Sequence, residues 1–455
     1  MVEQLVKAKG LLKWLQSNGG YFHPSAKLQI DDTTGLSIFA AKPIGPNERL
    51  VSCPFDLAVT PETATRAICQ VAGLEEENLV WPMGTLGKGE PWNERMRIGA
   101  YLGLHWVYQD QTTVEWPSAL IHKTYLNSLP DPSTTLMPLY YNPCELELLT
   151  GSNLYGAVKD RQKEWFEESA VLRTVLKEDG LTWERYLATS TYMSSRAFPS
   201  RLLRLSMEEQ STHQLHKENE VSHPVLLPGV DIFNHARGQP IIWLCSVMAP
   251  SPASHPLPCI SLVSSSVSDV NTQVFNNYGV KPNEELLLGY GFVLDNNPDD
   301  VVVLRLGADG LSPAISKRLE AKNLNIGERF ELRRDGEIDR RLLEVMRVML
   351  GEEEEEMDEN DEHAMHKKEE KEMKLELDVL ETLGGMLEDK LGKLEAGGKL
   401  SVDGQVRDQV KKMVSIYRKG QIDILNSAMD TLSERIERVE SLIGEGMGEC
   451  SCCCP

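Results

Sequence analysis

The stretch from Leu227 to Phe292 constrains the fold more than any other part of the chain. An apolar run broken by Pro228-Gly229 leads into Asn234-His235, and two Tyr-Gly steps follow at Tyr278 and Tyr290. Polar residues at the point where the backbone leaves a buried strand commonly bind ligands. Either Tyr-Gly step alone is explained by a packing tyrosine at a strand end. Two such steps with an Asn-His pair favour a β-rich binding site.

Two further apolar runs inside this stretch predict a β-hairpin. They extend from Ile241 to Val247 and from Cys259 to Val267, and the sequence APSPASHPLP separates them. Its prolines cannot donate ladder hydrogen bonds, so we expect a long surface tip. Glu285 to Gly289 is another short apolar run, and the pattern predicts that Tyr290 also stands at the end of a strand.

Composition sets the size and the class of protein. The chain has 455 residues, of which 41% are hydrophobic, so it can bury a large core in two or three domains. A formal net charge of -22 argues against nonspecific nucleic-acid binding, which needs an excess of Lys and Arg. Part of the acidity is local, in the run Glu352 to Glu362. This balance is compatible with a basic protein partner.

The N-terminal segment predicts an amphipathic helix rather than a membrane segment. Its apolar residues recur at helical spacing, and they are Leu5, Ala8, Leu11, Leu12 and Leu15. The segment is too charged and its apolar run too short for a signal peptide or a membrane span, and no other run reaches spanning length. Nine cysteines, scattered until the tail, favour a reducing cytosolic or nuclear setting over a disulfide framework.

Helical patterns dominate two other regions. Residues 62 to 195 carry apolar stripes at helical spacing, and the pattern returns beyond residue 310 around a polyacidic run.

Met207 to Pro224 holds three histidines, but no cysteine or carboxylate pattern that would complete a metal site. We therefore expect an exposed loop and no metal site there. The tail ECSCCCP is best explained as a frayed, reduced end. Its consecutive cysteines cannot easily face one metal, and Pro455 suits no prenylation signal.

Five motifs occur in one order within residues 20 to 305. They are Thr34-Gly-Leu-Ser-Ile-Phe-Ala40, Ser195-Arg-Ala-Phe198, Asp231-Ile-Phe-Asn-His235, Tyr278-Gly279 followed by Asn283-x-Glu285-Leu286, and Tyr290-Gly-Phe292. In these motifs the sequence resembles the SET-domain protein methyltransferases. It looks most like the branch that includes the RuBisCO large-subunit lysine methyltransferase and the fungal ribosomal-protein and elongation-factor lysine methyltransferases.

The resemblance implies an α+β fold: a SET domain of short β-sheets with a helical insert, followed by an all-α C-terminal domain. The implied boundaries are residues 1-20 for an N-terminal helix, 21-305 for the SET domain with its insert at about 90-195, 306-446 for a helical substrate-binding-like domain with an acidic loop at 352-374, and 447-455 for the Cys-rich tail. Coiled-coil dimerisation is the competing explanation of the C-terminal helices.

The resemblance also implies a site for S-adenosylmethionine. Gly35 and Leu36 would contact its methionine part through their main chain, although the second glycine of the family's Gly-x-Gly is Ser37 here. Arg196 would bind its carboxylate, a task suited to a planar fork of donors. Asn234 and His235 would hold the cofactor through hydrogen bonds. Asp231 belongs to the same set, with a simpler role in fixing the turn.

Tyr278 is the expected catalytic residue, the phenol of a channel in which the substrate lysine meets the methyl donor. Tyr290 and Phe292 would line that channel and, with Arg196, contact the substrate. Tyr278, Tyr290 and Phe292 would also border the cofactor. Methyl transfer is a direct displacement at carbon, so it needs alignment and no metal or covalent enzyme intermediate.

The resemblance therefore predicts a protein-lysine N-methyltransferase whose substrate is a non-histone protein, such as a ribosomal protein or a translation factor. Three alternatives stay open: a histidine methyltransferase of the same fold, a non-catalytic SET-fold interaction protein, and a helical-repeat scaffold. The β-rich stretch from Leu227 to Phe292 disfavours the last of these. Substrate identity, the number of methyl groups transferred and oligomeric state cannot be derived from the sequence.

Overall fold

The structure is a computed structural model that describes residues 2-85, 87, 89-203, 222-248, 256-307, 311-352, 362-399 and 404-446. The chain divides into two compact units. The first comprises Met1–Thr135 and Asp160–Val280, and the second comprises Leu136–Lys159 and Lys281–Pro455. The domain boundaries expected from the sequence are a different division and stay a prediction.

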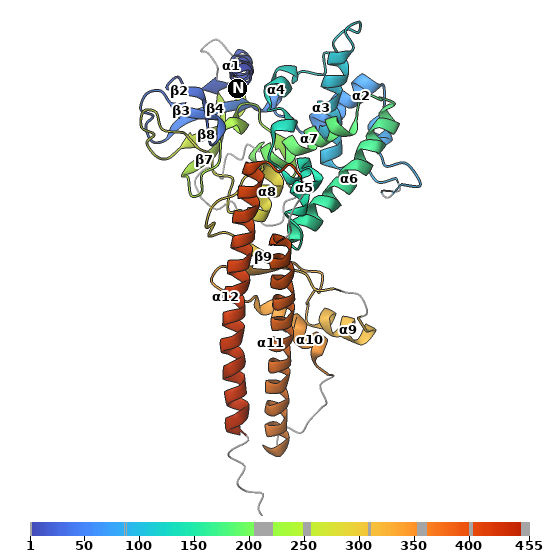
Figure 1. The fold of residues 1–455 in the computed structure, drawn as a ribbon. Helices are drawn as coiled ribbons and strands as arrows, with labels where there is room; N and C mark the ends of the chain where they lie inside the picture. Colours follow the sequence, from blue (N-terminus) through green and yellow to red (C-terminus); the bar gives the residue numbers. More distant parts are fainter. Residues whose placement is uncertain are drawn as a thin grey trace, which may run out of the picture. The chain divides into compact units, whose positions relative to one another are not determined.

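The first unit contains a four-stranded antiparallel sheet. Its strands, in spatial order, are β1 (Tyr21–Phe22), β4 (Glu48–Pro54), β8 (Leu257–Ser264) and β7 (Ile241–Met248). The predicted hairpin is confirmed, because β7 pairs with β8 along its whole length. In Figure 1 the strands gather on one side of this unit and helices α2, α3 and α7 on the other.

Two small two-stranded sheets complete the β-structure of this unit. They are β2 (Ala26–Asp31) with β3 (Gly35–Ala40), and β5 (Ala197–Pro199) with β6 (Pro224–Leu226). The turn between β2 and β3 is fixed by the Asp31 carboxylate, which accepts hydrogen bonds from the Thr33 and Thr34 backbone N–H groups at 2.9 and 2.8 Å. Gly35 closes the turn with a positive φ of 69°, which glycine adopts without steric cost.

Helices make up the rest of the first unit, as the pattern of residues 62 to 195 predicts. They are α1 (Val2–Ser17), α2 (Pro61–Ala72), α3 (Glu94–Asp110), α4 (Lys123–Ser128), α7 (Trp183–Arg196) and the part of α6 (Asn153–Leu176) that belongs to this unit. The amphipathic N-terminal helix is confirmed, since Ala8, Leu11 and Leu15 are fully buried. Helix α7 has Thr182 as its N-cap and ends at Arg196, and β5 begins at the next residue, Ala197.

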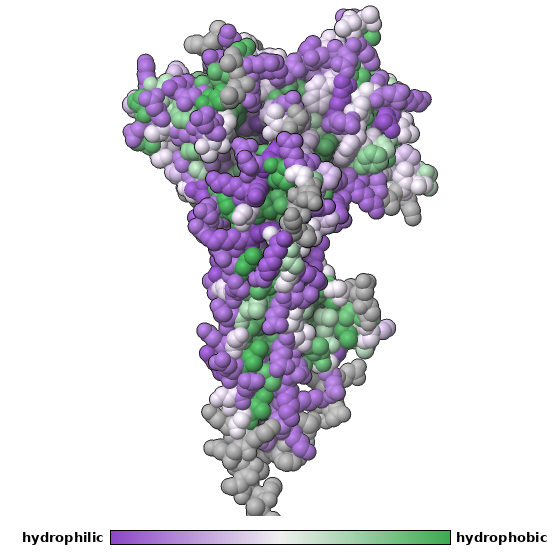
Figure 2. All heavy atoms as spheres, in the orientation of Figure 1, coloured by the Kyte–Doolittle hydropathy of each residue, from purple (hydrophilic) through white to green (hydrophobic). Residues whose placement is uncertain are grey.

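The second unit is mainly helical. Its elements are α5 (Pro143–Glu147), α8 (Asn283–Tyr290), α9 (Pro313–Ala321), α10 (Arg340–Leu350), α11 (Glu362–Gly398), α12 (Asp408–Gly446) and the hairpin of β9 (Val301–Leu304) with β10 (Phe330–Arg333). Figure 2 shows apolar residues running along α11 and α12, where Leu383, Leu387 and Leu425 belong to one buried core. The helical pattern predicted beyond residue 310 is confirmed.

One prediction for this unit is wrong. Tyr290 does not stand at the end of a strand, because the run Glu285 to Gly289 lies inside helix α8. Leucine and glutamate are good helix formers, and Gly291, with φ 78°, terminates the helix in the left-handed conformation. An apolar run this short has no periodicity that distinguishes a strand from a buried helix.

Four sequence predictions fall wholly or largely outside the described residues. They concern the His-rich segment, of which 207-221 is not described, the long tip of the β7–β8 hairpin, of which 249-255 is not described, the acidic run, of which 353-361 is not described, and the tail 447-455. His223 is described, and its Nδ1 lies 2.7 Å from Glu94 Oε1. Among the described helices, none combines the length and the low polarity that crossing a bilayer requires.

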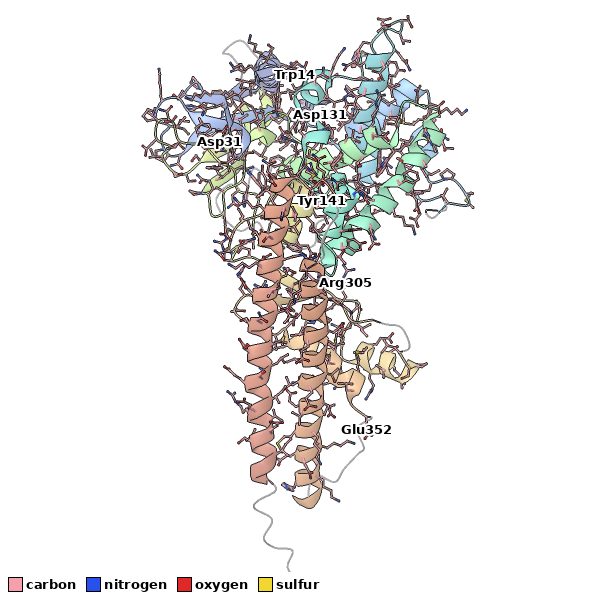
Figure 3. All side chains as sticks on the ribbon, viewed as in Figure 1. Trp14, Asp31, Asp131, Tyr141, Arg305 and Glu352 are labelled. Carbon is pink, nitrogen blue, oxygen red and sulfur yellow. The ribbon has the colours of Figure 1, made fainter. Side chains whose placement is uncertain are left out.

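A buried histidine pair fastens α3 to α4 in the first unit. His122 Nε2 donates to Leu57 O at 3.0 Å, so its Nδ1 accepts from the Tyr101 hydroxyl at 2.6 Å. His105 Nδ1 donates to Tyr101 O at 2.9 Å, and its Nε2 accepts from His122 N at 3.1 Å. Trp14, labelled in Figure 3, lies edge-on to His122 with ring centroids 6.0 Å apart. Both imidazoles are therefore neutral.

We expect acid to destabilise the fold through these histidines. Burial lowers the pKa of His105 to about 3 and that of His122 to about 4, so the unfolded chain binds protons first as the pH falls below about 6.5. Between pH 7.5 and pH 5 each histidine should remove about 2 kcal/mol from the free energy of unfolding. Urea denaturation at the two pH values measures the loss. His122→Asn should show a shallower pH dependence than wild type, and an identical dependence would contradict this role.

Candidate active site

The Asn-His motif and the segment that ends at Tyr278 lie side by side in the first unit. Asn276 N donates to Asn234 O at 2.8 Å and Ala236 N donates to Asn276 O at 2.9 Å, which makes a parallel bridge between His235 and Asn276. Val274 N donates to Ile38 O at 2.8 Å on the other side. The segment before Tyr278 is thus held between β3 and the Asn-His motif.

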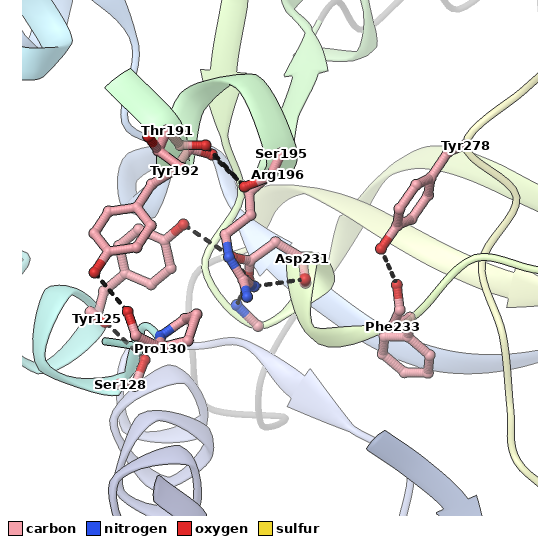
Figure 4. Close-up of polar contacts among 11 residues, drawn as sticks. Tyr125, Ser128, Pro130, Thr191, Tyr192, Ser195, Arg196, Asp231, Phe233 and Tyr278 are labelled. Carbon is pink, nitrogen blue, oxygen red and sulfur yellow. Dashed lines mark hydrogen bonds and ion pairs between the residues drawn. The ribbon is translucent and has the colours of Figure 1, made fainter. Parts of the chain in front are cut away.

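Tyr278 is fixed at three points. Its hydroxyl donates to Phe233 O at 2.9 Å, as Figure 4 shows, and its backbone N–H donates to His235 Nδ1 at 3.0 Å. Its ring stacks on the His235 ring with centroids 5.1 Å apart and planes 25° from parallel. Because the hydroxyl hydrogen is directed at Phe233 O, the lone pairs of the phenol oxygen are oriented away from that carbonyl.

Asn234 joins the Asn-His motif to the start of β3. Its Nδ2 lies 2.9 Å from Ser37 Oγ, 3.2 Å from Leu36 O and 3.3 Å from Thr34 O. The structure therefore brings Asn234 together with Gly35 and Leu36, the residues that the sequence assigns to the same pocket. The Nδ2 group of Asn234 therefore makes its hydrogen bonds within the protein, and it stabilises the turn at the start of β3.

Arg196, at the end of α7, meets Asp231 in a mostly buried ion pair. Arg196 Nη1 donates to Asp231 O at 3.0 Å and lies 3.3 Å from Asp231 Oδ2. The same Oδ2 accepts from the Tyr125 hydroxyl at 2.9 Å, and Oδ1 accepts from Gly229 N at 3.1 Å. The carboxylate is 1% exposed, whereas the Arg196 side chain is 23% exposed. In Figure 4 Asp231 lies between Arg196 and Tyr125, and the exposed fraction of the Arg196 side chain leaves part of it open to solvent.

The electrostatics of this pair reflect its burial. Burial raises the pKa of the Asp231 carboxyl, and the nearby charge of Arg196 and the Tyr125 hydroxyl oppose that rise. Burial alone would lower the pKa of Arg196, but the interactions with Asp231, Tyr125 and Tyr278 outweigh it and the net change is upward. Arg196 is therefore a permanent cation whose orientation Asp231 sets.

Two features of these residues suit ligand binding. Arg196 has N–H groups that could bind an anion, and Gly35 leaves space for a ligand to approach the backbone. Within the part of the chain that the structure describes, all the hydrogen bonds of Arg196 run through Nη1, so Nε and Nη2 have N–H groups to offer. A Cβ added at Gly35 would meet no atom within 4 Å, so the space beside this glycine is open. Both features fit the residue types assigned from the sequence.

Tyr290 and Phe292 belong to the second unit. Their rings form an edge-to-face pair with centroids 6.1 Å apart, and the Lys281 ammonium lies 5.6 Å from the Tyr290 ring centroid. Burial raises the pKa of Tyr290 to about 12, so its phenol stays protonated at neutral pH. Their part in a substrate channel stays a prediction. Among the described residues, no group of three His, Cys, Asp or Glu side chains is placed to hold a metal.

Three residues of this region were not assigned a site role from the sequence. Tyr125 completes the Asp231 cluster from a position 106 residues earlier, and no local pattern indicates that contact. From the sequence, Ser37 is notable only because it stands where the Gly-x-Gly pattern has a glycine. In the structure its hydroxyl bonds Asn234 Nδ2. Asn276 is 1% exposed, and its Nδ2 has no hydrogen-bond partner among the described residues, while its Oδ1 accepts from Trp243 Nε1 at 3.2 Å. The Asn276-Asn277 pair directly before Tyr278 is the one sequence feature that could have pointed to Asn276.

Comparison with solved structures identifies the fold. The structure of Rubisco LSMT bound to AdoMet matches with a TM-score of 0.67 and 18% identity, covering 99% of this chain and 97% of that one. The SET domain of LSMT bound to lysine and AdoHcy matches with a TM-score of 0.68 and 18% identity, over 96% and 93% of the two chains. The chain thus has the α+β SET-domain fold of the RuBisCO large-subunit methyltransferase type, as the sequence predicts.

Curated sequences show a likeness to fungal lysine methyltransferases. It is 30% identical over 304 residues to the ribosomal lysine N-methyltransferase set10 of Schizosaccharomyces pombe, covering 65% of this chain and 47% of that protein. It is 22% identical over 336 residues to the protein-lysine N-methyltransferase EFM1 of Saccharomyces cerevisiae, covering 65% and 51%. The resemblance to the fungal branch is confirmed, and the chain spans about half the length of these relatives. No family model matches it.

Proposed function

We propose that the chain is an S-adenosylmethionine-dependent protein-lysine N-methyltransferase that acts on a non-histone protein. The observation that carries the proposal is the arrangement of Tyr278, whose hydroxyl, backbone and ring are each held by the Phe233 to His235 segment. A rigidly held phenol suits a reaction that depends on alignment. When bound, S-adenosylmethionine supplies a methyl group activated by a positively charged sulfonium.

Residues of the first unit fit the parts of this cofactor. The N–H groups of Arg196 at Nε and Nη2 would bind its carboxylate, with Asp231 holding the guanidinium in place. The open side of Gly35 and the adjoining Leu36 backbone would border its methionine part. Asn234 would act through its backbone and through the turn that it secures, and His235 through its backbone beside the Tyr278 ring.

The Tyr278 oxygen would receive and orient the substrate amine. A lysine with an ordinary pKa near 10.4 costs about 4.6 kcal/mol to hold neutral at pH 7. An apolar channel lowers that cost because it disfavours the ammonium form. Because its own hydrogen is directed at Phe233 O, the phenol oxygen would accept a hydrogen bond from the substrate amine. That bond would fix the direction of the lone pair on the amine nitrogen. Tyr290 and Phe292 are proposed as further channel residues.

The substrate class follows from the relatives. Two curated relatives are named ribosomal lysine N-methyltransferases, and a third is a protein-lysine N-methyltransferase. A ribosomal protein or a translation factor is therefore the proposed substrate, and such partners meet the chain in the cytosol or the nucleus. The acidic balance of the chain suits a basic protein of this kind.

Arg196→Lys tests the cofactor site. Lysine keeps the charge but cannot bond Asp231 and a ligand carboxylate at once through a planar fork, so the Kd for S-adenosylmethionine should rise about 10- to 100-fold. Isothermal titration calorimetry measures this change. The matched control is Arg97→Lys, which alters a guanidinium of the same unit that bonds Trp92 O, Thr65 and Glu76. Its Kd should match wild type, and equal weakening in both variants would refute the assignment of Arg196.

A further inference from the structure

The hydroxyl of Ser37 has three polar contacts at the start of β3, and one of them reaches the Asn-His motif. Ser37 is 0% exposed, and its Oγ accepts from Asn234 Nδ2 at 2.9 Å. The same Oγ donates to Gly35 O at 3.0 Å and lies 2.8 Å from Thr34 Oγ1. A buried hydroxyl with three partners is fully used. Glycine at this position, as in the family pattern, lacks all three interactions.

Ser37 and Asn234 together account for three successive backbone carbonyls. Asn234 Nδ2 shares its two hydrogens among Ser37 Oγ, Leu36 O and Thr34 O, while Ser37 Oγ donates to Gly35 O. Because a peptide unit is planar, anchoring each carbonyl also orients the N–H group of the following residue. The two side chains therefore set the planes of the peptides on both sides of Gly35. Gly35 has a positive φ of 69° and pairs with Asp31 of β2, so these hydrogen bonds act together with the β2–β3 pairing.

We propose that Ser37 is a positioning residue for cofactor binding, which holds the turn from Thr34 to Leu36 in the shape that receives S-adenosylmethionine. This inference rests on the proposed function. Its hydroxyl touches no reacting atom and acts through Gly35 and Asn234. The serine hydroxyl at this position supplies hydrogen bonds to Gly35 and Asn234 that a glycine would lack.

Ser37→Ala should therefore weaken cofactor binding without slowing the chemical step. We expect the Kd for S-adenosylmethionine, and the KM for it, to rise about tenfold, because alanine removes the hydroxyl that contacts Thr34, Gly35 and Asn234 and leaves Asn234 partly unpaired. The kcat at saturating cofactor should stay within about twofold of wild type, since only binding is affected. Calorimetry gives the Kd, and radiolabelled methyl transfer to ribosomes gives KM and kcat.

Ser52→Ala is the matched control. Ser52 is equally buried, and its hydroxyl bonds Ser261 Oγ at 2.7 Å in the four-stranded sheet. It should lower the unfolding midpoint about as much as Ser37→Ala and leave the Kd unchanged. A rise in Kd of the same size in both variants would show that general destabilisation is the cause and would overturn the proposal.

A double-mutant cycle with Asn234→Ala sharpens the test. If the two side chains act as one unit, the Kd of the double variant should be raised by clearly less than the product of the two single effects. Independent, multiplicative effects would overturn the proposed coupling. Wild type that does not bind S-adenosylmethionine would overturn the proposed function and this inference with it. Wild type that binds while Ser37→Ala binds equally well would overturn the inference alone.

Discussion

Tyr278→Phe is expected to lower the rate of methyl transfer about 10²- to 10³-fold, the usual cost of removing one preorganised polar group from a reacting centre. The ring still stacks on His235 and the backbone N–H still donates to it, so only the oxygen is lost. The Kd for S-adenosylmethionine should change by less than about threefold. The lost oxygen is proposed to bond the substrate amine, so its loss affects the chemical step rather than cofactor binding. Radiolabelled transfer and calorimetry on the same preparation separate the two effects.

Tyr192→Phe is the matched control for this variant. Its hydroxyl also donates to a backbone carbonyl, Pro130 O at 2.6 Å, and Figure 4 shows both tyrosines. Its transfer rate should stay near that of wild type. If the two phenylalanine variants lose the same activity, the effect comes from loosened packing, and Tyr278 has no special role.

Glu168→Gln should cause the largest loss of stability in the helical part of the first unit. The carboxylate is 1% exposed and accepts from Arg95 Nε at 2.9 Å, Arg95 Nη2 at 2.8 Å, Asn93 Nδ2 at 2.7 Å and the Tyr186 hydroxyl at 2.7 Å. A glutamine offers one oxygen and turns an amide N–H towards one of these donors. It also leaves Arg95 without its buried counter-charge, so we expect a loss of about 3 kcal/mol in the free energy of unfolding.

Glu164→Gln provides the internal comparison, because Glu164 pairs with the same arginine at 2.5 Å from a position 57% exposed to solvent. An exposed ion pair contributes less than about 1 kcal/mol. Urea denaturation followed by circular dichroism should rank Glu168→Gln well below Glu164→Gln in midpoint. Equal midpoints for the two variants would show that the buried network does not hold α3, α6 and α7 together.

The sequence predicts the parts of the fold whose information is local. The β7–β8 hairpin follows from two apolar runs around a Pro-rich tip, and the long C-terminal helices follow from leucines at helical spacing. The run Glu285 to Gly289 is too short for its period to decide between strand and helix, so the sequence does not predict α8. The boundaries of helices are set by caps such as Gly291, whose conformation only the fold determines.

In the candidate site, too, the sequence predicts the residues that belong to local motifs but not their distant contacts. The ordered motifs bring Gly35, Arg196, Asn234, His235 and Tyr278 to attention, and the structure places these residues in one compact unit. What could not be predicted is which side chains hold them. The Tyr125 contact with Asp231 and the Ser37 contact with Asn234 each join residues about 100 to 200 positions apart, and no local pattern encodes such pairs.

The most direct test of the central claim is methyl transfer itself, followed by identification of the methylated amino acid. Purified chain is incubated with methyl-labelled S-adenosylmethionine and ribosomes from fission yeast that lack set10, so that sites of that relative are unmethylated. Wild type should label a ribosomal protein whose acid hydrolysate contains labelled N-methyllysine, and Tyr278→Phe should not. Labelled methylhistidine would contradict the lysine assignment. Wild type that neither binds S-adenosylmethionine nor labels any protein would contradict the account as a whole.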